Sequence, residues 1–157
     1  MKTKSLLLVL AVVVGSCFAG GADRKPGNTL PDQSFAAWNA HDPDKVVAFY
    51  TEDVVYEDVT FGEVAHGREE LKKLAAGFFA AVPDMKLETV SVSQHGNDGS
   101  VEWVFSGTDV GLFKTGKKFS VRGASRYQLR GGKVSSNKDF YDAATIMRQV
   151  GVLRETK

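Results

Sequence analysis

The feature that most constrains the fold is a run of long β-forming stretches between residues 86 and 141. The stretches are Lys86 to His95, Val101 to Phe113, Phe119 to Arg130 and Val134 to Tyr141. Short turn sequences that contain glycine, such as Asn97-Asp98-Gly99 and Gly131-Gly132, separate them. Successive strands joined by tight turns pair side by side in opposite directions. The second half of the chain is therefore predicted to form an antiparallel meander.

The first half of the chain has mainly helical spacing of its apolar residues. One helix is expected from Pro31, and a second, starting at Asp42-Pro43, is expected to include Phe49 and Tyr50 and to end at residues 51–53. A longer helix follows Gly67 and stops at Pro83. A short closing helix is expected between Asp142, as its N-terminal cap, and Gly151. Helices first and strands later indicate an α+β domain with helices on one face of the sheet.

A separate β-forming stretch, Val54 to Phe61, lies between the second and third predicted helices. Side chains alternate between the two faces of a strand, so Tyr56 and Asp58 are expected on the face that also carries Val54 and Thr60. A carboxyl group among apolar neighbours loses hydration, which raises its pKa and makes it a better base near neutral pH. The alternative for Asp58 is a solvent-facing or turn-capping role before Gly62.

The N-terminus is typical of an export signal. Lys2 and Lys4 precede an unbroken apolar run from Leu6 to Val14, and nine residues are too few to span a bilayer, which needs about 20. Cleavage either releases a free domain or, at the lipobox-like sequence before Cys17, leaves a lipidated cysteine. The predicted organisation is a signal peptide over residues 1–19, a flexible tether over 20–30 and one domain over 31–157. The expected location is periplasmic or extracellular, and any membrane contact would be through the lipid.

Composition excludes several classes of partner. The 157 residues carry a formal net charge of +1, with basic residues spread along the chain, so no nucleic acid is expected as a partner. The single cysteine and the scattered histidines lack metal-ligand spacing, so no metal is predicted. The sequence contains no phosphate-binding glycine loop, nucleophile elbow or HExxH motif, and a site without a cofactor is what remains.

Several short strings, in this order and spacing, resemble the SnoaL-like polyketide cyclases of the nuclear transport factor 2-like superfamily. They are Trp38-Asn39-Ala40-His41-Asp42-Pro43, the segment Phe49 to Tyr56, His66-Gly67-Arg68-Glu69-Glu70-Leu71, Pro83-Asp84, Asp139-Phe140-Tyr141-Asp142 and Gln149-Val150-Gly151. The resemblance covers about residues 31 to 154. It implies a cone in which a strongly bent, mixed or antiparallel sheet wraps a long helix around a blind apolar pocket. It also implies a homodimer.

Two aspartates are the main catalytic candidates under this resemblance. The segment ending at Asp58 is similar to the one that carries the general base of ketosteroid isomerases. The oxyanion-hole tyrosine and the protonated acid of those enzymes would fall at about Ser34 and Ala124, so steroid isomerisation is not supported. Asp139 lies where cyclases and limonene epoxide hydrolases of the superfamily carry an acidic residue. Its alternative role is a surface ion pair with Lys138 or Arg126.

Further candidates complete the predicted site. His66 is a possible second acid/base group, because imidazole titrates near neutral pH, although local packing in a loop is the alternative. Aromatic residues expected to line the pocket, or else to be plain core, are Tyr56, Trp103, Phe105 and Tyr127, together with Phe119. An Asp-Arg-Asp arrangement for epoxide hydrolysis lacks its arginine, since no spacing argument places Arg122 or Arg126 there.

Two functions remain open from the sequence. The first is a cofactor-independent acid/base enzyme, an isomerase, aldol-type cyclase or dehydratase, that acts on a small hydrophobic carbonyl compound with Asp58 and Asp139 sharing the proton transfers. The second is a non-catalytic module that binds a small hydrophobic ligand, or a dimeric accessory lipoprotein, which uses the same pocket.

Overall fold

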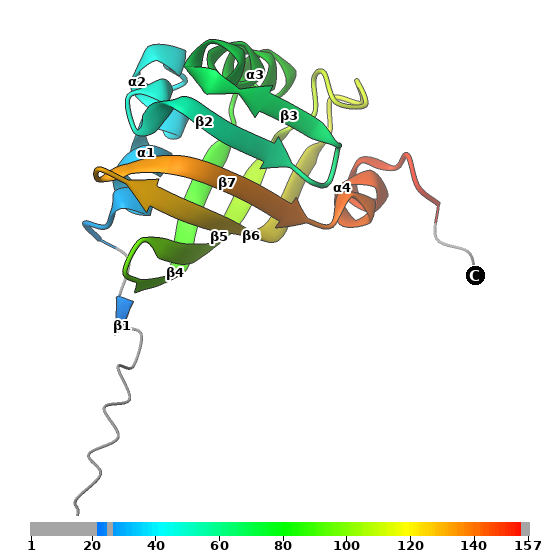
Figure 1. Ribbon diagram of the computed structural model, residues 1–157. Coiled ribbons are helices and arrows are strands. Elements are labelled where there is room, and N and C mark those ends of the chain that lie inside the picture. The colour runs from blue at the N-terminus through cyan, green and yellow to red at the C-terminus, as the bar shows by residue number, and fades with distance from the viewer. Residues whose placement is uncertain (1–21, 25–26, 155–157) are drawn as a thin grey trace, which may run out of the picture.

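The computed structural model describes residues 22–24 and 27–154 and shows an α+β fold built on one mixed sheet (Figure 1). The strands are β1 (Ala22–Arg24), β2 (Tyr50–Asp58), β3 (Glu63–His66), β4 (Lys86–His95), β5 (Asp98–Thr108), β6 (Lys118–Arg130) and β7 (Lys133–Tyr141). Their order in the sheet is β1-β4-β5-β6-β7-β2-β3, so the predicted meander β4 to β7 is present. Only the pair formed by β2 and β7 is parallel within these ranges.

Four helices accompany the sheet in the described ranges. They are α1 (Leu30–Asn39), α2 (Pro43–Val47), α3 (Gly67–Ala81) and α4 (Ala143–Val150). Helix α1 packs against β4 and α3 against β2, while α4 contacts β6 beyond the end of β7 (Figure 1). No helix in residues 27–154 is long and apolar enough to cross a bilayer.

The sheet is strongly curved, so its concave face wraps the helices. Register shifts interrupt the β4–β5 pairing between Thr89 and Ser91 and the β6–β7 pairing between Gln128 and Leu129. Such bulges bend a strand and increase its twist. The core fills the space between the concave face and the helices, and its fully buried side chains include Val46, Val54 and Leu71.

The predicted helix caps follow the sequence signals. The carboxylate of Asp142 accepts the amide N–H of Ala144 at 2.9 Å and begins α4, and Gly151 ends it with a φ of 80°, a left-handed conformation that glycine adopts without steric cost. At α1, Thr29 and Asp32 form a capping box. The folded domain therefore begins slightly before Pro31.

Four boundaries differ from the sequence predictions. The second helix ends at Val47, and Tyr50 opens β2 because this segment pairs with β7. Strand β2 ends at Asp58 rather than at Phe61. The turn after β4 lies at residues 96–97, one position earlier than expected. Part of the expected flexible tether, Ala22–Arg24, pairs antiparallel with β4.

The long strand expected up to Phe113 also stops early, at Thr108. The next residue, Asp109, is fully buried, and its carboxylate accepts the amide N–H groups of Phe113 at 2.8 Å and of Thr115 at 3.0 Å. These bonds fold residues 109–117 into a compact loop, because they give the backbone an alternative to strand pairing. The predicted export signal over residues 1–19 and Cys17 lie outside the described residues.

Candidate functional site

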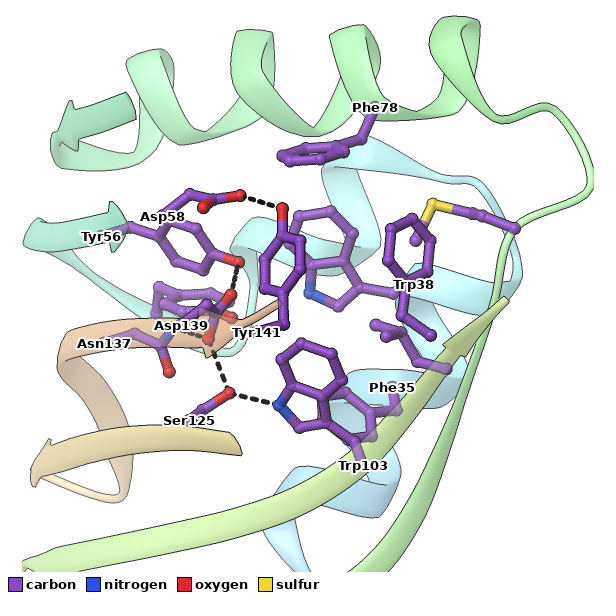
Figure 2. A pocket seen from close by; sticks show the side chains of 14 residues that line it. Phe35, Trp38, Tyr56, Asp58, Phe78, Trp103, Ser125, Asn137, Asp139 and Tyr141 are labelled. Carbon is purple, nitrogen blue, oxygen red and sulfur yellow. Dashed lines mark hydrogen bonds between the residues drawn. The ribbon is translucent and has the colours of Figure 1, made fainter. Parts of the chain in front are cut away.

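A small aromatic pocket lies between the concave face of the sheet and helices α1 and α3 (Figure 2). Its cavity volume is about 60 Å³. Eight of its fourteen lining residues are aromatic: Phe35, Trp38, Tyr50, Tyr56, Phe78, Trp103, Phe105 and Tyr141. The others are Asp58, Met85, Leu87, Ser125, Asn137 and Asp139. A water-sized void occupies roughly 10–15 Å³ on this kind of scale, so the pocket has room for about five non-hydrogen atoms.

The parallel pairing of β2 and β7 places the two candidate aspartates together. Asp58 and Asp139 are direct partners in the register, and Tyr56 is the partner of Asn137. Because side chains alternate, Tyr56 and Asp58 on β2 face the same side as Asp139 and Tyr141 on β7. Each tyrosine then reaches diagonally to the carboxylate on the neighbouring strand. The hydroxyl of Tyr56 donates to Asp139, and that of Tyr141 donates to Asp58 at 2.6 Å.

The Asp139 carboxylate is held entirely by side chains. Its Oδ1 accepts from the Ser125 hydroxyl at 2.6 Å and from the Asn137 amide at 2.7 Å, and its Oδ2 accepts from Tyr56. Burial raises the pKa of Asp139 above its ordinary value, and the charge of Asp58 adds to this, while the three hydrogen bonds oppose it. A carboxylate offers about four acceptor positions, which leaves one for a ligand.

The Asp58 carboxylate is held largely by the backbone. It is 1% exposed, and its Oδ1 accepts the N–H groups of Thr60 at 2.9 Å and of Phe61 at 3.1 Å. These bonds close the turn that follows β2. The Oδ1 atom of Asp58 therefore caps the turn, as one interpretation of the sequence proposed, while its Oδ2 atom accepts from Tyr141 at the pocket.

Ser125 links the indole of Trp103 to the carboxylate of Asp139 through hydrogen bonds. The Nε1 atom of Trp103 lies 2.8 Å from the Ser125 hydroxyl oxygen, and an indole nitrogen can only donate. Ser125 therefore accepts from Trp103 and directs its own single proton to Asp139, as Figure 2 shows. This chain fixes the direction of every proton between the three residues.

The tyrosines of the pocket stay protonated at neutral pH. Burial and the charge of Asp139 raise the pKa of Tyr50 to about 12 and that of Tyr56 well above its ordinary value. Burial, the charge of Asp58 and the hydrogen bond to it raise the pKa of Tyr141. All three hydroxyls are consequently hydrogen-bond donors rather than bases.

Three of the predicted aromatic residues, Tyr56, Trp103 and Phe105, line the pocket. Tyr127 lines a separate cavity of about 30 Å³ together with residues of α1, because it lies further along the inward face of β6. Phe119 is buried and lines neither cavity, which matches the core alternative. Ser125 and Asn137 border both cavities.

His66 does not lie with the carboxylates. It is an exposed residue at the end of β3, immediately before α3, and its backbone N–H donates to Glu70 at 2.8 Å. The structure therefore places His66 apart from Asp58 and Asp139, at the exposed end of a strand rather than in a loop. The surface ion pair proposed for Asp139 is also wrong, because Lys138 points outward and pairs with Glu57 at 2.6 Å.

The two positions that correspond to the oxyanion hole of ketosteroid isomerases do not line the aromatic pocket. Ser34 is buried beside the smaller cavity. Ala124 is next to Ser125 in sequence and points to the opposite, outer face of β6. Arg122 and Arg126 share that outer face and are exposed, so neither supplies an arginine to the carboxylates.

Four polar residues of the site were not among the sequence candidates: Tyr50, Ser125, Asn137 and Tyr141. A local signal existed for Tyr141: the strings Tyr56-Glu57-Asp58 and Asp139-Phe140-Tyr141 each place a tyrosine and an aspartate two residues apart, on one strand face. Their pairing depends on the parallel contact between two strands far apart in the chain. Asn137 lies two residues before Asp139 on the same strand face, and Ser125 pairs with Asp139 across the β6–β7 hairpin, so alternation and the turn signal applied to both.

The comparisons with known proteins agree with this architecture. The sequence profile of the SnoaL-like domain matches residues 32–137, about two thirds of the chain. The chain belongs to the SnoaL-like domain family and has the nuclear transport factor 2-like fold.

Solved structures show the same fold. A hypothetical protein from Catenulispora acidiphila with a ketosteroid isomerase-like fold, in complex with trimethylamine, is 23% identical, with a TM-score of 0.72 over 78% of this chain and 92% of that one. A proposed hydroxylase from Streptomyces galilaeus is 22% identical, with a TM-score of 0.69 over 82% and 86%. A proposed polyketide cyclase from Xanthomonas campestris is 25% identical, with a TM-score of 0.67 over 77% and 93%.

Proposed function

We propose that the pocket is a cofactor-independent acid/base site that moves a proton at carbon next to the carbonyl group of a small hydrophobic compound. Such proton transfer is the common step of isomerases, aldol-type cyclases and dehydratases. The observation that carries the proposal is Asp139, a pocket-facing carboxyl group with a raised pKa, an open acceptor position and three oriented donors.

The residues take distinct roles in this proposal. Asp139 accepts the proton from carbon and returns it, while Ser125, Asn137 and Tyr56 hold its carboxylate in one orientation. The developing enolate oxygen needs a hydrogen-bond donor. The hydroxyl of Tyr141 supplies it by turning its proton from Asp58 to the substrate oxygen. The surrounding aromatic rings exclude water from the reaction.

The size of the cavity restricts the substrate. A volume of about 60 Å³ fits a small molecule or the reactive end of a larger one. A polycyclic substrate would need the half-buried rings of Phe35 and Phe78, which come from α1 and α3, to move aside. The family relation to polyketide cyclases therefore extends to the type of chemistry more readily than to the size of the substrate.

The test is hydrogen exchange of a small ketone such as cyclopentanone in D₂O, followed by loss of its α-proton NMR signal. The wild-type protein is expected to accelerate exchange, and Asp139→Asn to lower the acceleration by about 10²–10⁴-fold, the usual contribution of a positioned base. The matched control is Glu102→Gln, which makes the same charge change at an exposed position on the outer face. Exchange that is equal in wild type and Asp139→Asn would contradict the proposal.

The second candidate is a binding module that uses the same pocket without turnover. The observation in its favour is that both carboxylates already accept three hydrogen bonds each, which suits a fixed recognition site as well as a base. Saturable binding of a small ligand with no acceleration of ketone exchange would favour this function.

The location of the protein and its oligomeric state are also proposals. Export to the periplasm or the outside of the cell, with or without a lipid on Cys17, is supported by the apolar run from Leu6 to Val14. A homodimer is supported by the exposed apolar side chains Val55, Val59 and Phe140 on the side of β2 and β7 away from the pocket. Mass spectrometry of the mature N-terminus and light scattering of the purified protein test these two points.

A further inference from the structure

The pocket combines two acidic groups with a wall of aromatic rings. Asp58 and Asp139 are register partners on adjacent strands, and both line the cavity. Within the described part of the chain, the lining residues include no lysine, arginine or histidine. Hydrogen bonds from neutral groups orient the two carboxylates but do not cancel their charge. Uncompensated charge of one sign in a poorly hydrated site is costly, so the pocket favours a positively charged occupant.

The aromatic wall suits the same occupant. The ring centroids of Trp38 and Tyr56 are 6.2 Å apart, and those of Trp103 and Tyr141 are 5.7 Å apart. In the view of Figure 2, the Tyr141 ring lies between the two carboxylates and the Trp38 indole, and Ser125 links the Trp103 indole to Asp139. The electron-rich faces of aromatic rings attract cations, and cages of such rings bind quaternary ammonium groups.

The size of the cavity selects among cations. Room for about five non-hydrogen atoms matches a tri- or tetramethylated ammonium group, which sheds its weakly held hydration more readily than a metal ion. The same residues offer few free polar positions for a hydrated metal ion, because each carboxylate already accepts three hydrogen bonds.

We infer that the pocket binds a small alkylated ammonium cation, held by the charges of Asp58 and Asp139 and by the surrounding aromatic rings. This inference rests on the proposed function in one respect, that this pocket is the functional site, and it names the class of ligand. A neutral hydrophobic molecule of the same size satisfies the proposed function but not this inference.

The test compares tetramethylammonium with tert-butanol, which has nearly the same size and shape but no charge. The chain has two tryptophans, Trp38 and Trp103, and both line the pocket. Their fluorescence and their two indole N–H signals in NMR spectra therefore report directly on occupancy. At matched ionic strength, tetramethylammonium is expected to bind saturably and at least about ten-fold more tightly than tert-butanol.

Two variants test whether the cation binds beside Asp139. Asp139→Asn keeps the shape of the side chain but removes its charge, and it is expected to weaken tetramethylammonium binding about ten-fold without changing the affinity for tert-butanol. Glu102→Gln removes one exposed charge on the outer face and is expected to leave both affinities unchanged. Circular dichroism and thermal unfolding of each variant verify that the fold is retained.

Two results would overturn the inference. One is equal affinity of the wild-type protein for the two probes, and the other is a lack of saturable tetramethylammonium binding. The comparison of probes needs no variant, so it holds even if Asp139→Asn fails to fold. Ketone exchange is measured separately with an uncharged substrate, so a failure of the cation inference leaves the acid/base proposal intact.

Discussion

Asp58 and Asp139 are neighbours in the sheet, yet the protein holds them in different ways. The partners of the Asp58 carboxylate include two backbone amides of the turn after β2, whereas all partners of the Asp139 carboxylate are side chains. Asp58 is 1% exposed, while part of Asp139 faces the cavity. A carboxylate bonded to backbone is part of the fold, because its loss opens a turn. A carboxylate bonded to side chains at a cavity is available for chemistry.

The largest stability effect is expected at Asp58. Asp58→Ala leaves two turn amides and the Tyr141 hydroxyl without their acceptor and should lower the free energy of unfolding by about 3 kcal/mol. Asp139→Ala should cost only about 1 kcal/mol, because the hydroxyl and amide side chains that donate to it can turn to other acceptors, whereas the turn amides cannot. Urea unfolding of both variants measures the difference. Equal losses would remove the distinction between the two residues.

The next effect is expected at Ser125, which links Trp103 to Asp139. Ser125→Ala leaves the buried indole N–H without an acceptor and should lower the free energy of unfolding by about 2 kcal/mol. It also removes a donor from Asp139, so the pKa of that carboxyl group should rise further. The control is Ser120→Ala, an exposed position on the same strand. A loss no greater than that of the control would contradict the hydrogen-bond chain.

Smaller effects should separate the two tyrosines. Tyr141→Phe and Tyr56→Phe each remove one hydroxyl donor and should cost about 1 kcal/mol. Only Tyr56→Phe should raise the pKa of Asp139 appreciably, since its hydroxyl donates to that carboxylate. Carboxyl NMR titrations of the two variants test this. The same shift in both would show that the two pairs are not independent.

The free energy of unfolding should depend on pH through the titration of Asp139. Its pKa is raised in the folded protein above the unfolded value of 3.8, so the folded state binds more protons between the two values. The stability that Asp139 contributes is fully present at pH values below its pKa in the unfolded chain. It is lost as the pH rises through its pKa in the folded protein. The wild-type protein should therefore lose stability relative to Asp139→Asn over that interval. A constant difference between the two unfolding free energies would contradict the raised pKa.

Much of the fold could be predicted from the sequence, because strand alternation, turn residues and helix caps are local signals. The cap residues of α4, Asp142 and Gly151, were predicted correctly, and alternation correctly put Tyr56 and Asp58 on one face of β2. The register between β2 and β7 was not predictable, because these strands lie about eighty residues apart and pair in parallel without a connecting turn. The tyrosine–aspartate hydrogen bonds between these two strands were therefore missed.

The alternation of side chains along a strand predicts which face a residue is on, but not which cavity on that face it reaches. Tyr127 and Ser125 share one face of β6, but only Ser125 reaches the aromatic pocket. His66 was assigned from its titration range alone, and the structure places it outside the pocket. Tyr50 was assigned to a helix because its apolar spacing continued that of Val46 and Val47, whereas pairing with β7 makes it the first residue of β2.

The most direct test of the central claim is a carbon-detected NMR titration of the aspartate carboxyl groups, with Asp58→Asn and Asp139→Asn used to assign the signals. The account predicts that Asp139 titrates clearly above the ordinary value of 3.8, because it is desolvated beside a second carboxylate. The exposed cap residue Asp142 should titrate below that value, because the Thr145 hydroxyl and the N-terminal amides of α4 donate to its carboxylate. An Asp139 that titrates at or below its ordinary value would show a solvated or strongly stabilised carboxylate and would contradict its role as the base of the pocket.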